Sequence, residues 1–213
     1  MEASAAMFLR EGALRLGIPL VGEAPARFAK YVDMLGLWNR RIKLTTVTQD
    51  RDVVDRHFLD SLAVAPTLRA FDEVVDVGSG AGFPGVPLAI VLPGVRVTVV
   101  ESIQKKAAFL EALKRELGLG NLTVEARRME DLVREGRLFG GAVSRATLAP
   151  PEWLRLGRQL VAPRGCLVAM VVPGEGVTAE GLAPWWPQWF DDANLQAPYA
   201  PGRALVVLRG RRG

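Results

Sequence analysis

The chain has 213 residues, of which 49% are hydrophobic and 23% are charged. Its one cysteine, Cys166, and its one histidine, His57, exclude an intrachain disulfide, a cysteine zinc cluster and a two-histidine metal site. The net charge of +4 and the isoelectric point near 9.6 suit a polyanionic partner without requiring one. We found no apolar run long enough to span a bilayer and no signal-peptide pattern, so we expect a cytoplasmic protein.

Residues 1–70 precede the main pattern and read as a helical region packed on the rest of the chain. Apolar residues recur there at helical spacing over three segments, 3–16, 25–38 and 50–70. The loop between the second and third segments carries a local basic cluster, Arg40, Arg41 and Lys43. These charges either contact RNA phosphates or pair with the aspartates at 50, 52 and 55, and the sequence leaves both interpretations open.

A buried strand followed by closely spaced glycines occupies residues 74–85, which read VVDVGSGAGFPG. Gly78, Gly80 and Gly82 allow a sharp turn and close approach of a ligand to the backbone at a helix N-terminus. The dinucleotide fingerprint would need glycine at position 83, where the chain has Phe83. The spacing instead resembles the first motif of Rossmann-like S-adenosylmethionine-dependent methyltransferases. The alternative is a tight strand-to-helix turn without a ligand.

The next strand, 95–101, ends in Glu101. In doubly wound folds, an acid at this position accepts hydrogen bonds from the ribose hydroxyls of the ligand. In that role, replacing Glu101 with alanine should weaken cofactor binding by roughly 1.5–3 kcal/mol and leave ligand-free stability unchanged. The alternative is a solvated charge at the end of a strand.

From residue 71 onward strands and helices alternate, which predicts a parallel sheet with helices on both faces. A later pair of strands should lie antiparallel at one edge, and the aromatic stretch 173–189 reads as irregular. We therefore expect an α/β, Rossmann-like methyltransferase domain over 71–213 with an N-terminal helical extension. The expected strands cover 74–77, 95–101, 121–124, 139–144, 166–172 and 204–208, and the helices cover 84–92, 104–117 and 151–161.

Two further groups of residues follow expected strands, at the sheet edge where open α/β folds bind ligands. In the loop 127–131, Met129 and Glu130 can offer a backbone amide and a carboxylate to an adenine ring; the alternative is a capped surface turn. Arg145 can contact a carboxylate, a phosphate or a guanine edge, or it can form a surface salt bridge.

These segments together resemble the bacterial 16S ribosomal RNA guanine-N7 methyltransferase family, also called the glucose-inhibited division protein B family. The matching segments are WNRRIKLTTVTQDRDVVDRHFLDSL at 38–62, the strand and glycine loop at 74–93, ES-x-x-KK-x-x-FL at 101–110, RRMED and SRA. The resemblance implies that Gly78, Phe83, Met129, Glu130 and Arg145 bind S-adenosylmethionine. It also implies methylation of one guanine of 16S ribosomal RNA at N7.

The C-terminal third departs from the family pattern, because Met170-Val171-Val172 stands where Leu-Lys-Gly is typical. The pattern returns around Arg203. We take Arg203 and the basic cluster as candidate RNA contacts, and His57 as either structural or a further RNA contact. We expect a monomer acting on ribosomal RNA or the small subunit.

The chemistry needs no general base, because guanine N7 carries a free lone pair and the sulfonium is already activated. Catalysis can rest on near-attack positioning, so we assign no catalytic residue and no metal. A redox sensor that binds a dinucleotide, and a methyltransferase acting on another substrate class, are the alternatives.

Overall fold

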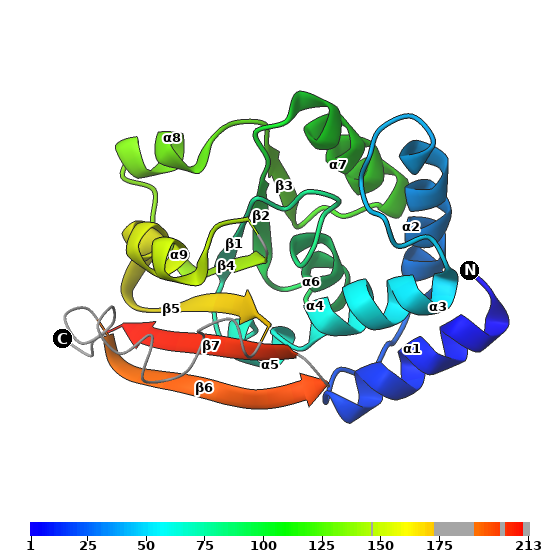
Figure 1. The fold of residues 1–213 in the computed structure, drawn as a ribbon, viewed down its shortest axis with the longest axis horizontal. Helices are drawn as coiled ribbons and strands as arrows, with labels where there is room; N and C mark the ends of the chain where they lie inside the picture. Colours follow the sequence, from blue (N-terminus) through cyan, green and yellow to red (C-terminus); the bar gives the residue numbers. More distant parts are fainter. Residues whose placement is uncertain (146, 173–189, 201–202, 211–213) are drawn as a thin grey trace.

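One mixed sheet organises the chain, and in the residues described it has seven strands in the order β3-β2-β1-β4-β5-β7-β6 (Figure 1). The structure, a computed structural model, describes residues 1–145, 147–172, 190–200 and 203–210. The strands are β1 (Glu73–Val77), β2 (Arg96–Val100), β3 (Leu122–Glu125), β4 (Phe139–Arg145), β5 (Val161–Val171), β6 (Phe190–Ala200) and β7 (Arg203–Gly210). The strands β1 to β5 are parallel, whereas β7 is antiparallel to both β5 and β6.

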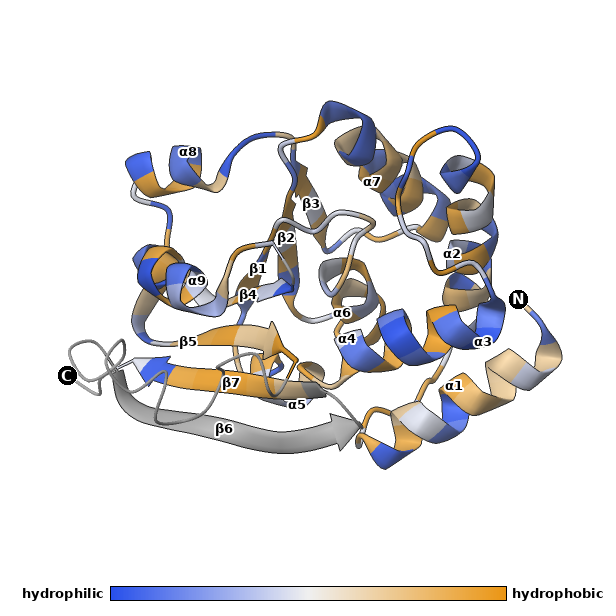
Figure 2. Cartoon of the chain, viewed as in Figure 1, coloured by the Kyte–Doolittle hydropathy of each residue, from blue (hydrophilic) through white to orange (hydrophobic). Residues whose placement is uncertain are grey.

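The strand β1 is an inner strand, and its side chains are buried on both faces of the sheet. Val74 pairs with Val97 of β2 and with Gly141 of β4, and this register continues to Val77. Near-continuous β-branched residues are what a strand covered on both faces requires. Figure 2 shows the apolar character of these inner strands. The carboxyl ends of β1, β2 and β4 therefore meet at one edge.

Helices cover both faces of the sheet (Figure 1). One face carries α6 (Gly85–Val91) and α7 (Gln104–Leu117), and the other carries α8 (Met129–Arg134) and α9 (Pro150–Gly157), which continues as a 3₁₀ turn, η2 (Arg158–Leu160). The helix α7 ends as expected at Gly118, whose φ of 62° is the left-handed conformation that glycine adopts most easily. On α9, the indole N–H of Trp153 donates to the carbonyl of Val168 at 2.8 Å.

The N-terminal helices extend the core on the α6 side. They are α1 (Ala3–Arg15), α2 (Ala24–Asn39), α3 (Asp50–Val53), a π-helical segment η1 (Val54–Leu59), α4 (Asp60–Leu62) and α5 (Ala65–Leu68). Phe28, Tyr31 and Phe58 belong to the same buried cluster as Phe83 of the glycine loop. The π-helical turn is a rare form that often marks a functional position.

The largest difference from the sequence-based expectation is β6, which we did not predict. Its residues, FDDANLQAPYA, lack the apolar alternation of a half-buried strand. The strand pairs with β7 alone, at the edge of the sheet. The expected helix over 50–70 is interrupted after Leu62, and the expected helix over 151–161 becomes a 3₁₀ turn after Gly157 and ends before Val161, where β5 begins. The aromatic stretch 173–189 lies outside the described residues.

No helix in the described ranges has both the length and the apolar character needed to cross a bilayer.

Candidate functional site

The glycine loop after β1 is held in shape by backbone hydrogen bonds and left-handed glycines. Gly78, Gly80 and Gly82 have φ values of 72°, 58° and 98°. A side chain at Gly80 would meet only the carbonyl of Gly78, at 3.9 Å, so this glycine faces open space. A side chain at Gly82 would come within 2.6 Å of the Tyr31 hydroxyl. Gly80 therefore lies on the ligand side of the loop, and Gly82 faces the protein interior.

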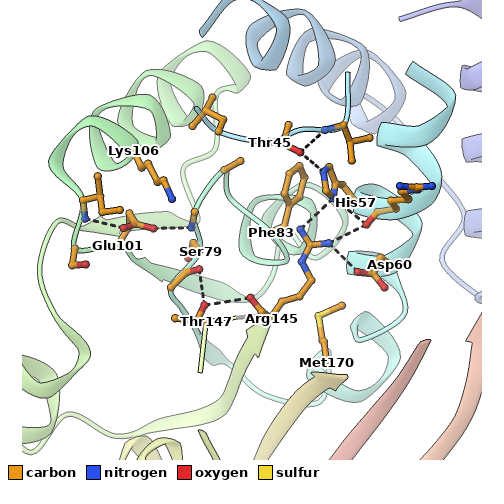
Figure 3. Close-up of a pocket in the computed structure, with 18 of the residues that line it drawn as sticks. Thr45, His57, Asp60, Ser79, Phe83, Glu101, Lys106, Arg145, Thr147 and Met170 are labelled. Atoms are coloured by element: carbon orange, nitrogen blue, oxygen red, sulfur yellow. Dashed lines mark hydrogen bonds and ion pairs between the residues drawn. The ribbon is translucent and has the colours of Figure 1, made fainter. Parts of the chain in front are cut away.

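Glu101 is part of this loop's support, and not a solvated charge. The residue is only 5% exposed. One carboxylate oxygen accepts the N–H of Gly80 at 2.9 Å and the other accepts the N–H of Ile103 at 2.8 Å (Figure 3). Each oxygen can still accept a further bond. The carboxylate thus joins the ends of β1 and β2 and keeps capacity for a ligand.

Asp76, one residue before the end of β1, is fully buried beneath the loop. Its Oδ2 accepts the N–H of Gly85 at 2.8 Å, while Oδ1 has no hydrogen-bond partner in the described residues. Burial raises the pKa of Asp76 to about 6, and the hydrogen bond from the Gly85 N–H opposes part of that rise. A positive charge added near Asp76 would therefore favour the ionised form of its carboxyl group.

A cavity of about 640 Å³ opens over this loop. Its walls come from the glycine loop, from the ends of β2, β4 and β5, and from the N-terminal region. They include Thr45, His57, Asp60, Gly78, Gly80, Phe83, Glu101, Lys106, Arg145 and Val171. Such a volume lies within the range of small-molecule and cofactor sites.

A second cavity, of about 150 Å³, continues the cleft over β1 and β2. It shares Gly78, Ser102 and Thr147 with the first and is closed by Met129 and Glu130. These two residues begin the helix α8, where we had expected a loop. The backbone N–H of Arg128 donates to the Asp131 carboxylate, which starts the helix there.

Arg145 leaves the end of β4 and reaches the N-terminal helices. Its guanidinium donates to Asp60 Oδ2 at 2.8 Å and to the carbonyl of Arg56 at 3.0 Å. Both partners of the ion pair are largely buried, with 18% and 6% of their side chains exposed. A surface salt bridge is therefore excluded. Sequence reasoning missed Asp60, because 85 residues separate it from Arg145.

Phe83 is the centre of an aromatic stack on the wall of the larger cavity. It is 3% exposed, and its ring is stacked on His57 at 4.5 Å and on Tyr31 at 5.3 Å between ring centroids. The guanidinium of Arg145 lies 5.0 Å from the same ring. Phe83 thus sets the position of His57 and Arg145 on the cavity wall.

The candidate RNA contacts are placed differently from one another. Arg40, Arg41 and Lys43 are exposed on the loop after α2. None of the three lies within ion-pair distance of a carboxylate in the part of the chain that is described. The predicted alternative, pairing with the nearby aspartates, is therefore wrong.

His57 lies in the cavity, with Nε2 2.8 Å from the Thr45 hydroxyl. Arg203 is the first residue of β7, and its side chain lies outside the described residues. Where the family's lysine is typical, Met170, Val171 and Val172 form an apolar part of the cavity wall.

The sequence profile of one family, rRNA small subunit methyltransferase G, matches residues 25–175 of this chain. The protein named ribosomal RNA small subunit methyltransferase G from Stenotrophomonas maltophilia is 39% identical over 213 residues, covering 99% of this chain and 97% of that protein. Its counterpart from Geobacter sulfurreducens is 38% identical, covering 80% and 79%.

The chain belongs to this family. The predicted family and the predicted enzyme class, a methyltransferase using S-adenosylmethionine, are thereby confirmed. Solved structures agree on the fold. An O-methyltransferase from Bacillus cereus in complex with SAH has a TM-score of 0.59 at 13% identity and covers 87% of this chain and 91% of its own. An O-methyltransferase from Streptomyces achromogenes in complex with SAM has a TM-score of 0.57 at 14% identity, covering 85% and 90%.

Proposed function

We propose that this rRNA methyltransferase transfers the methyl group of S-adenosylmethionine to N7 of one guanine in 16S ribosomal RNA. The observation that carries the proposal is the cleft itself. In a chain of this family, a left-handed glycine loop, a buried acid at the end of the next strand and an arginine from β4 line one continuous cavity.

The cleft residues fit the three parts of the cofactor. Glu101 has free acceptor capacity for the ribose hydroxyls at the start of the larger cavity. Met129 and Glu130 close the smaller cavity, where they suit an adenine ring. Gly78 lines both cavities. Arg145 lines the larger one, where its guanidinium can receive the carboxylate of the cofactor. Gly80 lets the ligand approach the loop, and Gly82 keeps the loop in shape.

The bound cofactor supplies an activated methyl group, so the chain's own residues need only position the acceptor. His57 is held by Thr45 and by stacking on Phe83, which suits a fixed wall. Because N7 has no proton to remove, a rigid wall that orients the acceptor guanine is sufficient for methyl transfer, and this orientation provides the acceleration.

The RNA side of the proposal rests on the exposed basic loop. Arg40, Arg41 and Lys43 have no acidic partner in the described residues, so they are available to phosphates. Because N7 of a paired guanine lies in the deep, narrow groove of an RNA helix, the target must be unpaired or in a loop. We further propose that the protein acts as a monomer in the cytoplasm, that residues 1–70 and 71–213 form its two regions, and that Arg203 contacts RNA.

Two measurements test this function. Calorimetry should show binding of S-adenosylhomocysteine and no binding of NAD; the reverse result would favour a dinucleotide sensor. Labelled S-adenosylmethionine, incubated with unmodified 16S RNA and with small subunits from cells lacking the modification, should label at least one of the two. Label on neither, with the cofactor still bound, would point to another substrate class.

A further inference from the structure

A separate cavity lies beside the cofactor cleft, between the end of α2 and the start of α7. Its volume is about 340 Å³, and it is lined by Leu37, Trp38, Arg41, Ile42, Lys105 and Ala108. The ring of Trp38 makes an edge contact with buried Phe109, at 5.6 Å between centroids and 62° between ring planes. The proposed methyl-transfer site does not use this cavity.

The cavity combines an apolar interior with a cationic rim. Leu37 is 58% exposed and lines the cavity together with the half-buried Trp38 and Ile42, so the exposed apolar surface here is a group of side chains and not a single leucine. Arg41 and Lys105 are exposed on opposite elements and have no ion pair in the described ranges. An apolar face flanked by two uncompensated cations matches a nucleotide, whose base is flat and apolar on its faces and whose phosphate is an anion.

The cavity lies next to the cofactor cleft along the start of α7. Lys105 lines this cavity, whereas Ile103, which caps the start of α7, and Lys106, the residue after Lys105, line the larger cleft. When the target base of an RNA strand enters the cleft, a neighbouring nucleotide of the same strand would therefore pass this cavity. Arg40 and Lys43, on the same exposed loop as Arg41, extend the basic surface away from the cavity.

We propose that this cavity binds one unpaired nucleobase of the RNA, close to the methylated guanine, with its phosphate on Arg41 and Lys105. The proposal rests on the function proposed above, since the RNA must first be a substrate. Leu37 and Trp38 would contact this second base. Their contact would fix the register of the RNA strand while the target guanine enters the cleft.

The test is a set of short single-stranded RNA oligonucleotides that contain the mapped target guanine, each with one abasic nucleotide at a different flanking position. Binding is measured by fluorescence anisotropy with wild type and with Leu37→Asn. One abasic position should weaken binding to wild type about fivefold or more, and should have almost no additional effect on Leu37→Asn. Lys105→Gln should lower the salt slope of binding by about 0.7.

Leu14→Asn and Lys114→Gln are the matched controls, because Leu14 is 66% exposed on α1 and Lys114 lies in the last turn of α7. Both should bind RNA as wild type does, and all four variants should keep wild-type affinity for S-adenosylhomocysteine. The inference is overturned if Leu37→Asn binds every oligonucleotide like wild type, or if each abasic site weakens both proteins equally. Absence of methyl transfer to any RNA would instead refute the proposed function.

Discussion

Replacement of Glu101 separates its support of the glycine loop from its proposed contact with ribose. In the structure its carboxylate accepts two backbone N–H groups, from Gly80 and Ile103, in a largely buried position. Hydrogen bonds to a charged group contribute about 1.5–3 kcal/mol each, and an N–H that can bind water instead loses less. We therefore expect Glu101→Ala to lower the free energy of unfolding by about 2–4 kcal/mol. The sequence-based expectation of unchanged ligand-free stability is thus revised.

That loss corresponds to a fall in Tm of roughly 4–16 °C for a chain of this size, measured by scanning calorimetry without ligand. Glu101→Gln keeps an acceptor for one N–H, so its Tm should fall less. Titration calorimetry should show that both variants lose roughly 1.5–3 kcal/mol of affinity for S-adenosylhomocysteine. Glu111→Ala, on the exposed side of α7, is the control and should change neither quantity.

Two results would refute this reasoning independently. An unchanged Tm in Glu101→Ala would show that the two backbone bonds contribute nothing to the folded state. An unchanged dissociation constant for S-adenosylhomocysteine in a folded variant would show that Glu101 does not contact the ribose.

Gly80→Val should abolish S-adenosylhomocysteine binding in a folded protein, because its side chain would enter the ligand space; wild-type affinity by calorimetry would contradict this. The raised pKa of Asp76 means that the folded state binds a proton more tightly than the unfolded state. The contribution of Asp76 to stability should therefore fall by about 3 kcal/mol as pH rises from about 4 to above 6. Urea unfolding should show that Asp76→Asn removes this dependence, and an identical pH profile would argue against it. Replacing Arg40, Arg41 and Lys43 together with glutamine should leave cofactor affinity intact and reduce the salt slope of RNA binding by about 0.7–0.9 for each phosphate that these side chains neutralise. Superimposable salt series for this variant and wild type would exclude these phosphate contacts.

The parallel part of the fold could be predicted from sequence because its signals are local. The run of valines in β1, the glycines after it and the left-handed Gly118 at the end of α7 each specify their own conformation. The strand β6 could not be predicted in this way. Its sequence is polar, and what defines it as a strand is its antiparallel pairing with the edge of β7.

The candidate site shows the same limit. The glycine loop and Glu101 were found from spacing, but the partners of Glu101 depend on how β1 and β2 end side by side. Nothing local in the sequence indicates that Asp60 meets Arg145, or that His57 stacks on Phe83. These contacts arise only when the N-terminal helices pack against the sheet.

The central claim is tested most directly by locating the transferred methyl group on the RNA. 16S RNA labelled by the enzyme and S-adenosylmethionine should be digested to nucleosides, and its modified position mapped by chain cleavage specific for N7-methylguanosine. We predict that the label elutes as N7-methylguanosine and that cleavage occurs at one unpaired guanine. Label in any other nucleoside, or cleavage spread over many guanines, would contradict the account.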